Sequence, residues 1–463
     1  MSVIVKKEDL DNKTEAKLLR DSKIRELRTN FAPYPKTHKL YAETKTEYIF
    51  PRAIGIEGKT WRKMYNTKKA KIKFTYQKSP YTGNGGDNPD PKGEDRQQEI
   101  VVTEGVEKLR EDGHCFYHFS PGYGKTSCAV ETVRRLRRTT LWVAFNTGIQ
   151  KQAYDEFKKF SDARVYRYAP KKLPPNDAQV VIIGLMTAAK LSVEYLSRFQ
   201  MVVLDEVDQS TAKSFFPLYV KICPDYLLGL SATIKKANGL DKALFKYFGP
   251  QKEFLYRFIE KKNATVIKVQ TIFEPTIEMN ENQRTGAMQV DPHEITRSLA
   301  ENPARTRFIA NHIKRDSLKG QCFVLSPRKE LIFALNEELV KTGYDVDYKT
   351  VGKTTLDVTK RILIGGMQGT GRGLDTDANF IFILGIPSNI AQFAGRLRDP
   401  NGTIYIYVDK YSKFELDWSR KCMPYLKKLG CAIKFQTGDE ESQDYVVQTA
   451  KKVKETSILD EYM

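Results

Sequence analysis

Short apolar runs that alternate with amphipathic stretches are the feature of this 463-residue sequence that most restricts its fold. Stretches such as KQAYDEFKKF have the spacing of helices, and they separate runs of strand length. The runs lie at residues 114–119, 139–145, 179–185, 199–205 and 226–233. Buried strands that alternate with helices are typical of a parallel sheet covered on both faces. The sequence therefore predicts an α/β lobe from about residue 95.

The same alternation starts again after about residue 260. Its apolar runs lie at residues 264–270, 320–326, 360–366, 379–385 and 402–408. A chain of this length is expected to hold two to four domains. We therefore predict an α/β fold with two tandem parallel-sheet lobes, the first at residues 95–250 and the second at residues 251–437.

Three segments flank or precede these lobes. Residues 1–78 open with a charged helical stretch and alternate like a strand in KAKIKFTY, so we interpret them as an N-terminal accessory region. Residues 79–94 are dense in Gly, Pro, Asn and Asp, which predicts a linker. Residues 438–463 carry an acidic run followed by mixed charges, and we expect a surface tail.

Positive charge is in excess along the chain. Lys and Arg number 76 against 57 Asp and Glu, so the formal net charge is 76 − 57 = +19. A surplus of this size favours a polyanionic partner, because phosphate contacts release condensed counterions. A basic protein with no such partner is the alternative.

Two basic segments have more than one interpretation. Residues 61–78 place Trp61, Tyr65, Phe74 and Tyr76 among lysines, a mixture that can pair with phosphates and stack on bases. A sheet edge protected by lysines is the alternative. We interpret the arginines of residues 133–138 as a solvated helix face.

Cysteine use and hydropathy indicate the compartment. The six cysteines lie far apart and form no C-x-x-C pair, which argues against a zinc ribbon or a secreted disulfide framework. No apolar run approaches the roughly 18 residues that a membrane span needs. We therefore expect an intracellular, non-membrane protein.

A phosphate-binding loop is indicated by HCFYHFSPGYGKTS, which has the layout of a strand, a glycine loop and a helix start. Glycines let backbone N–H groups approach phosphate oxygens, and a helix N-terminus favours the same anion. Lys125 would then reach the β- and γ-phosphates, and Thr126 would bind Mg²⁺. The usual first small residue of this motif is Phe119 here. The expected loop residues are Pro121, Gly122, Tyr123, Gly124, Lys125, Thr126 and Ser127.

Carboxylates follow the apolar run of residues 199–205. Asp205, Glu206 and Asp208 lie within four residues, and buried strands rarely end this way unless a cation or a base is needed. Asp205 can hold Mg²⁺, and Glu206 can polarise an attacking water. An acidic strand end that faces solvent is the alternative. The next apolar run ends in Ser-Ala-Thr, at Ser231 and Thr233.

In this order, the three elements resemble the motifs of superfamily-2 helicases, whose two lobes are RecA-like. The resemblance covers about residues 95–410, some two thirds of the chain. It assigns adenine binding to Gln98, 125 − 98 = 27 residues before Lys125, with Gln97 as a weaker candidate. In the second lobe it assigns nucleotide binding to Gly373 and Asp375 of GTGRGLD. It also implies that Asp208, Ser231, Thr233 and Gln392 couple the site to movement.

The sixth motif of the family is matched by QFAGRLRD, which contains Gly395, Arg396 and Arg398. The resemblance implies arginine fingers here, since planar guanidinium groups suit the charge that spreads over a γ-phosphate. The family usually has G-R-x-x-R, whereas this chain has G-R-x-R followed by Asp399. Arg396 matches directly, while Arg398 is either a second finger or no finger.

Within superfamily 2, residues 229–250 resemble the DNA translocases of the excision-repair and transcription-factor group, with Asn238-Gly239 where Asp-Gly is frequent. The size, the accessory region and the ending at residues 413–430 are closest to the transcript-release helicases of poxviruses and African swine fever virus. That resemblance implies an ATP- and Mg²⁺-dependent helicase that unwinds DNA 3′ to 5′ during viral transcription. It implies DNA, RNA polymerase or transcription factors as partners, and a monomer when isolated. If the chain is viral, it implies the host cytoplasm, the viral factory and the virion as locations.

Other functions remain open from the sequence. DNA repair is another role for a DNA translocase, and an RNA helicase is the main alternative among enzymes. A non-hydrolysing module that binds nucleic acid is the alternative of another class. Lys125, Glu206 and Arg396 argue against that module, because an inactive site has no reason to keep all three.

Overall fold

The chain forms two compact units, Met1–Phe258 and Ile259–Met463, each of which is treated by itself. In this computed structural model the described residues are 2–28, 34–56, 94–169, 174–175, 177–234, 239–257, 263–281, 288–350, 356–367, 378–387, 390–394, 397, 399, 401–437 and 446–449. Side chains are described for all of these except residues 94–97, 213, 289, 391–392 and 446–449. The basic and aromatic segment of residues 61–78 and Asn238 thus lie outside the described residues.

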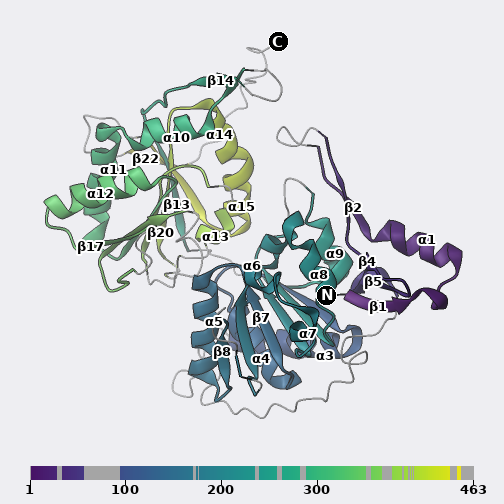
Figure 1. Cartoon of the computed structure of the whole chain (residues 1–463). Helices are drawn as coiled ribbons and strands as arrows, with labels where there is room; N and C mark the ends of the chain where they lie inside the picture. The colour runs from purple at the N-terminus through teal and green to yellow at the C-terminus, as the bar shows by residue number, and fades with distance from the viewer. Residues whose placement is uncertain are drawn as a thin grey trace. The chain divides into compact units, whose positions relative to one another are not determined.

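A seven-stranded sheet forms the centre of the first unit, and every neighbouring pair of its strands is parallel (Figure 1). The strand order is β12-β6-β11-β10-β7-β9-β8. The strands are β6 (His114–Phe119), β7 (Thr140–Ala144), β8 (Val165–Arg167), β9 (Val180–Gly184), β10 (Met201–Asp205), β11 (Tyr226–Ser231) and β12 (Leu255–Arg257). The five apolar runs of the first series are therefore strands. β12 brings part of the expected second lobe, residues 255–257, into the first unit.

Helices cover both faces of this sheet because successive strand residues point to opposite sides. Phe116 of β6 packs edge-on against Phe248, whereas the hydroxyl of Tyr117 lies 2.8 Å from Oγ1 of Thr132 on the other face. Trp142 packs against Phe157. The helices are α3 (Glu94–Asp112), α4 (Lys125–Leu136), α5 (Thr147–Phe160), α6 (Leu185–Ala188), α7 (Val193–Leu196), α8 (Phe216–Lys221) and α9 (Lys242–Phe248), with 3₁₀ turns at Val207–Thr211, Lys213–Phe215 and Gln251–Glu253.

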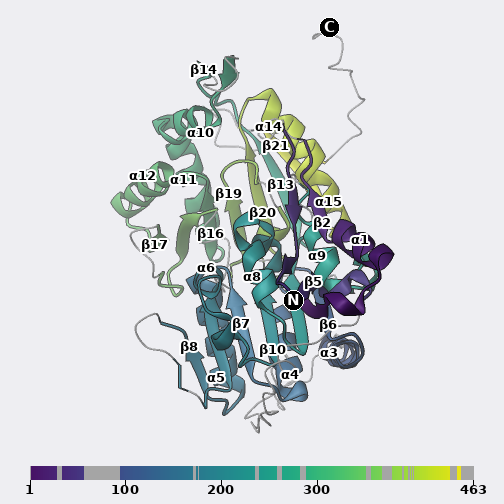
Figure 2. The same ribbon diagram turned by 45° about the vertical axis from the view of Figure 1, so that its right-hand side comes forward.

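The N-terminal residues build a small module on the face that α8 and α9 cover (Figure 2). The amide of Ser2 donates to the carbonyl of Ile222 at 2.9 Å, and the hydroxyl of Tyr247 donates to the carbonyl of Leu40 at 3.0 Å. Buried Ile4, Ile24 and Leu40 belong to the core of the first lobe. The module comprises antiparallel strands β1 (Ser2–Lys6), β5 (Glu47–Pro51) and β4 (Ala42–Glu43), the pair β2 (Lys23–Arg25) and β3 (Thr37–Lys39), helix α1 (Asn12–Asp21), and 3₁₀ turns at Lys7–Asp9 and Arg52–Ile54.

Arg52 fastens this module to the first sheet. Its buried guanidinium donates to the carbonyl of Gly113 at 2.5 Å, to that of Asp225 at 3.0 Å, and also to that of Pro224. Gly113 and Asp225 directly precede β6 and β11. The described part of the region that the sequence predicts to be accessory, residues 2–28 and 34–56, is therefore packed into the first unit.

An eight-stranded sheet forms the centre of the second unit, in the order β17-β18-β16-β19-β20-β13-β21-β22. All neighbours are parallel except β21 and β22. The strands are β13 (Thr265–Gln270), β16 (Cys322–Ser326), β17 (Val346–Lys349), β18 (Ile362–Gly366), β19 (Phe380–Ile383), β20 (Thr403–Val408), β21 (Ala432–Thr437) and β22 (Val446–Thr449). The interpretation of residues 438–463 as a tail throughout is wrong at β22, where β-branched residues pair with the edge of the sheet.

The helices of the second unit are α10 (Pro292–Ala300), α11 (Pro303–Ser317), α12 (Lys329–Lys341), α13 (Ile390–Ala394), α14 (Ser412–Asp417) and α15 (Met423–Lys428), with a π-helical turn at Trp418–Cys422 and a hairpin of β14 (Met279–Glu281) and β15 (Met288–Val290). A buried ion pair joins α11 to the end of β20: Nε and Nη2 of Arg305 donate to the two carboxylate oxygens of Asp409 at 2.8 and 2.9 Å. Thr271 donates to the same carboxylate at 2.8 Å. Because all three side chains are buried and paired, α11 is fixed against the sheet.

The predicted fold class, an α/β chain with two parallel-sheet lobes in tandem, is confirmed. Each of the ten predicted apolar runs contains one strand of these sheets. Among the described residues, no helix has the length and the apolar character needed to cross a membrane.

Candidate nucleotide-binding site

Three neighbouring strands of the first sheet carry the predicted site residues at their carboxyl ends. β6 leads into the loop of residues 120–124, β11 ends at Ser231, and β10 ends at Asp205. The order β6-β11-β10 puts these ends side by side. Open parallel sheets bind ligands at this edge, where loops and helix N-termini converge. The fold therefore gathers the site residues of the first lobe in one place.

The loop of residues 120–124 has the backbone of an anion cradle. Gly122 and Gly124 have φ angles of 87° and 91°, a region that glycine adopts without strain. A Cβ on Gly124 would lie 2.7 Å from Nε2 of Gln98, so a larger residue here would have to displace the Gln98 side chain. Gly124 is the N-cap of α4, whose first N–H groups have no partner within the helix. This geometry suits a bound phosphate.

Polar side chains at the start of α4 have local partners. The ammonium of Lys125 donates to the carbonyl of Phe119 at 3.4 Å, which folds the side chain over the loop. Oγ of Ser127 donates to Oε2 of Glu156 on α5 at 3.2 Å. Thr126 is partly exposed beside them. Lys125 thus lies over the glycine loop, and Ser127 joins α4 to α5.

Gln98 of α3 lies against this loop. Its side chain is 4% exposed, and its Nε2 donates to the carbonyl of Tyr123 at 2.7 Å. A flipped amide would bring two acceptors together, so the carbonyl of Tyr123 fixes the orientation. Oε1 is left buried with no partner among the described residues. A lone acceptor suits the amino group of adenine and disfavours the carbonyl of guanine, which fits an adenine nucleotide.

Asp205 has a buried carboxyl group that lacks a full counter-charge. It is 6% exposed. Burial and, to a smaller extent, the charge of Glu206 raise its pKa to about 7, against the opposing effect of the Lys125 ammonium. A divalent cation at this point would supply the missing positive charge. Thr126 and Asp205 thus offer the oxygen ligands that Mg²⁺ prefers, and nucleotide phosphates would complete the coordination.

Glu206 has a strained backbone. Its φ and ψ angles are 52° and 51°, in the left-handed region that costs a residue other than glycine about 1–3 kcal/mol. Its Oε2 is buried without a hydrogen-bond partner among the described residues. A strained, unpaired carboxylate beside a phosphate loop fits a general base.

Asp208, Ser231 and Thr233 form one hydrogen-bonded group. The hydroxyl oxygen of Ser231 lies 2.8 Å from Oδ1 of Asp208 and 2.6 Å from the carbonyl oxygen of Thr233, and the amide of Thr233 donates back to it at 3.1 Å. Gln209 donates to Oδ2 of Asp208. The structure therefore links the carboxylates after β10 to the segment after β11.

The candidate residues of the second lobe are not described in comparable detail. Gly373, Asp375, Gly395, Arg396 and Arg398 lie outside the described residues. Gln392 belongs to α13, but its side chain is not described. Their assigned roles stay predictions.

The expectation that the arginines of residues 133–138 form a solvated face is wrong for two of them. Arg134 and Arg135 both bond the buried carboxylate of Glu131, and Arg135 also reaches Glu99 on α3. The spacing of Glu131 and Arg135 predicts their pair on one helix. The partner on α3 is 36 residues away in the sequence, and no local pattern indicates it.

Fold and site together are those of a RecA-like nucleotide-binding protein, and comparisons with known proteins agree with this class. A family model described as "Type III restriction enzyme, res subunit" matches residues 92–236. A putative helicase of Invertebrate iridescent virus 6 is 23% identical over 375 residues, covering 74% of this chain and 83% of the relative. A putative ATP-dependent RNA helicase of Acanthamoeba polyphaga mimivirus is 25% identical over 316 residues, covering 65% of this chain and 60% of the relative.

Two further similarities agree with these. A putative ATP-dependent RNA helicase of African swine fever virus (isolate Pig/Kenya/KEN-50/1950) is 30% identical over 164 residues, covering 34% of this chain and 32% of the relative. The solved structure of S. cerevisiae Dbp5 bound to RNA and ADP BeF3 has a TM-score of 0.52 at 14% identity, covering 74% of this chain and 90% of that chain. This last likeness concerns the fold alone. These similarities support the assignment of the chain to the superfamily-2 helicases, with relatives in large DNA viruses.

Proposed function

We propose that the chain is an ATP-driven DNA helicase that translocates 3′ to 5′ and acts in viral transcription, in transcript elongation or release, or in DNA repair. The observation that carries the ATP-driven part is the convergence of Gln98, the glycine loop and Asp205 at the ends of neighbouring strands. The preference for DNA rests on the resemblance of residues 229–250 to DNA translocases and of residues 413–430 to the transcript-release helicases. RNA polymerase or transcription factors would then be the protein partners.

Each residue of the site has a proposed task. Lys125 and the loop N–H groups hold the β- and γ-phosphates, while Thr126 and Asp205 hold Mg²⁺, which neutralises phosphate charge when bound. Glu206 accepts a proton from the attacking water. Arg396, with Arg398 as a second candidate, stabilises the γ-phosphate from the second lobe, where Gly373 and Asp375 also contact the nucleotide. Gln392 joins the Asp208–Ser231–Thr233 group in coupling.

A track for nucleic acid is supported at the same edge of the first sheet. Phe145 directly follows β7 and is 41% exposed, and Met186 follows the neighbouring β9 and is 61% exposed. Asn146 caps α5 by accepting from the amide of Ile149 at 2.9 Å, and the start of α5 favours a phosphate. An exposed ring beside a helix N-terminus can stack on a base while the backbone phosphate is held. The net charge of +19 supports such contacts.

RNA unwinding is the second candidate. The mimivirus and African swine fever virus relatives carry the description RNA helicase. A strand held through phosphates and stacking is DNA or RNA alike, because only the 2′-hydroxyl distinguishes them along the backbone.

An ATPase titration separates the candidates. Hydrolysis is measured with single-stranded DNA, duplex DNA and single-stranded RNA, and unwinding is then measured on duplexes with 3′ or 5′ tails. The proposal expects stimulation by DNA and unwinding of 3′-tailed DNA. Lys125→Ala, which removes the ammonium that would hold the phosphates, is the inactive control. Stimulation by RNA alone, or unwinding only from 5′ tails, would overturn the corresponding part.

A further inference from the structure

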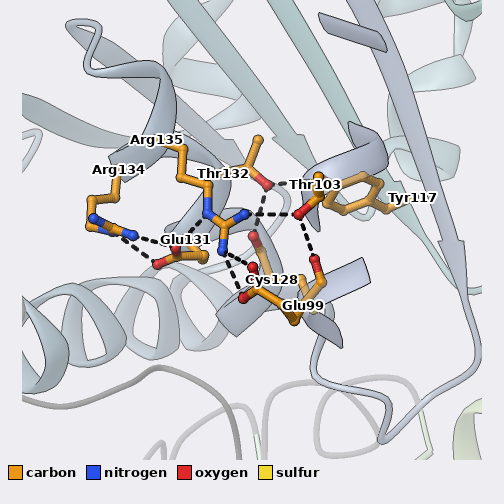
Figure 3. Close-up of polar contacts among 8 residues, drawn as sticks. All are labelled: Glu99, Thr103, Tyr117, Cys128, Glu131, Thr132, Arg134 and Arg135. Atoms are coloured by element: carbon orange, nitrogen blue, oxygen red, sulfur yellow. Dashed lines mark hydrogen bonds and ion pairs between the residues drawn. The ribbon is translucent and has the colours of Figure 1, made fainter. Parts of the chain in front are cut away.

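Helices α3 and α4 are joined by one arginine (Figure 3). Nη2 of Arg135 donates to both carboxylate oxygens of Glu99 at 2.7 Å, and its Nη1 donates to Oγ1 of Thr103 at 3.0 Å. Oγ1 of Thr103 donates in turn to the carbonyl of Glu99 at 2.9 Å. A guanidinium that meets a carboxylate with charge-assisted bonds fixes direction as well as distance.

A buried carboxylate holds that arginine in place. Nε of Arg135 donates to Oε1 of Glu131 at 2.7 Å, and the Glu131 side chain is 4% exposed. Arg134 bonds the same carboxylate at 2.6 and 3.1 Å (Figure 3). Both of these contacts lie within α4. Of the two guanidinium groups on Glu131, that of Arg135 bridges to the neighbouring helix.

The bridge lies next to the residue that faces the nucleotide loop. Glu99 directly follows Gln98, and α4 is the helix that begins at the phosphate loop. Gln98 has little freedom, since it is 4% exposed and its Nε2 donates to the carbonyl of Tyr123 at 2.7 Å. A shift of α3 by about 1 Å would stretch the bond to Tyr123 beyond the normal range.

We propose that Arg135 is a positioning residue: through Glu99 it holds α3 in register with α4, and thereby aims Gln98 at the adenine of ATP. This inference rests on the proposed use of Gln98 in the nucleotide site. Loss of the bridge weakens the contact of Gln98 with adenine and leaves hydrolysis at the phosphates unchanged. It therefore raises KM for ATP and lowers the preference for ATP over GTP, with little change in kcat.

The test compares Arg135→Met with Arg134→Met. Both variants remove one guanidinium from Glu131, but only the first breaks the bridge to α3. Steady-state kcat and KM are measured for ATP and for GTP with saturating nucleic acid. For Arg135→Met we expect KM for ATP to rise about fivefold and the ATP-to-GTP ratio of kcat/KM to fall by a similar factor, the size of a partly exposed ion pair. Arg134→Met should keep the wild-type ratio.

A purely structural role gives a different result. A poorly folded variant has fewer active molecules, which lowers kcat for both nucleotides and leaves KM and the ratio unchanged. Glu99→Gln breaks the same bridge at a half-exposed position, so it should lower the ATP-to-GTP ratio as Arg135→Met does. It provides the test if Arg135→Met folds poorly. Arg135→Lys should recover part of the ratio. An unchanged ratio in both Arg135→Met and Glu99→Gln, or an equal fall in Arg134→Met, overturns the inference.

Gln98→Ala separates this inference from the proposed function. If Gln98→Ala lowers the ratio while Arg135→Met does not, the bridge has no part in base reading and the proposed nucleotide site stands. If Gln98→Ala leaves the ratio unchanged, the assignment of adenine to Gln98 fails and the inference fails with it. The double variant should show no further fall than Gln98→Ala alone, because both changes act on one contact.

Discussion

The hydroxyl oxygen of Ser231 lies 2.8 Å from Oδ1 of Asp208, a bond that joins the carboxyl ends of two adjacent parallel strands. Both side chains are buried, with exposures of 0% and 3%. A buried carboxylate that loses such a partner is destabilised by about 1.5–3 kcal/mol. The pair is therefore a rigid connection between the carboxylates that follow β10 and the segment that holds Thr233.

We expect Ser231→Ala to separate hydrolysis from movement. The variant should still hydrolyse ATP, because Lys125 and Glu206 are untouched, but it should open about tenfold fewer base pairs per ATP, since the link to Thr233 is broken. Unwinding and phosphate release measured on the same tailed duplex give this ratio. Ser210→Ala is a matched control, since Ser210 bonds the carbonyl of Val207 outside this link. If Ser231→Ala opens as many base pairs per ATP as the wild type, Ser231 does not couple hydrolysis to movement.

Glu206→Gln should bind ATP but hydrolyse it at least about 100-fold more slowly, because the amide keeps the shape of the side chain and loses its basicity. Single-turnover hydrolysis and nucleotide binding measure the two steps separately. Turnover at the wild-type rate would mean that another carboxylate is the base. Asp208 would be examined first, although Ser231 and Gln209 already occupy its carboxylate.

Glu206→Gly should make the first unit more stable while abolishing hydrolysis. Glycine adopts a φ of 52° without strain, so the free energy of unfolding should rise by about 1 kcal/mol. Chemical unfolding of Glu206→Gly and Glu206→Gln provides the comparison, since only the first relieves the backbone. A Glu206→Gly protein less stable than Glu206→Gln would contradict the assignment of strain.

Arg396→Ala should reduce nucleic-acid-stimulated ATPase by about 10³-fold, within the range for arginine fingers. ATP binding without nucleic acid should change far less, because the finger acts only when both lobes engage the nucleotide. The measurement is kcat with and without saturating nucleic acid. Arg398→Ala tests the irregular G-R-x-R spacing: a comparable loss makes Arg398 a second finger, and a mild loss gives it another role. Full stimulated turnover in Arg396→Ala would refute the two-lobe mechanism.

The second unit should lose stability in mild acid through His312. Its Nδ1 lies 2.6 Å from the hydroxyl of Tyr407, and burial, aided by the charge of Arg315 and opposed by that of Asp316, lowers the pKa of His312 from 6.5 to about 3. Because the folded pKa is the lower one, the unfolded chain binds the proton first. Stability is complete above pH 6.5 and falls between there and pH 3, by about 2 kcal/mol at pH 5.

The stability of the second unit alone can be measured by the protection of β19 and β20 amides from hydrogen exchange across this pH range, corrected for the intrinsic pH dependence of exchange. His312→Gln should remove most of the pH dependence that this proton causes. His293→Gln is the control, because His293 is exposed on α10. An equally steep loss of protection in His312→Gln would assign the acid sensitivity to other groups.

The sequence predicts the long strands because a strand buried on both faces is a continuous apolar run, as in residues 201–204 and 404–408. It does not predict the edge strands Val165–Arg167 and Leu255–Arg257, since three residues are too few to show a period. For a similar reason, the sequence does not predict that the N-terminal module packs into the first lobe. Its contribution to that core, such as Ile4 and Leu40, is spread over short elements.

For the site, the order of the motifs predicts the chemical roles of single residues, and the parallel strands explain why the loop, Asp205 and Ser231 lie close together. The sequence does not predict the backbone conformation of these residues or their pairing with residues distant in the chain. The left-handed backbone of Glu206 and the fixed amide of Gln98 arise from packing around them. The bond of Arg135 to Glu99 depends on how two helices cross, which no local spacing encodes.

The contacts of Arg52 determine where a fragment that contains only the first lobe should begin. A fragment that starts at α3 would leave the carbonyls of Gly113, Pro224 and Asp225 without the cation that they share. It would also uncover the hydroxyl of Tyr247 and the apolar surface beneath Leu40. An exposed apolar core surface is a typical cause of insolubility. An isolated ATP-binding lobe should therefore keep residues 2–56, even when only the chemistry of residues 94–257 is under study.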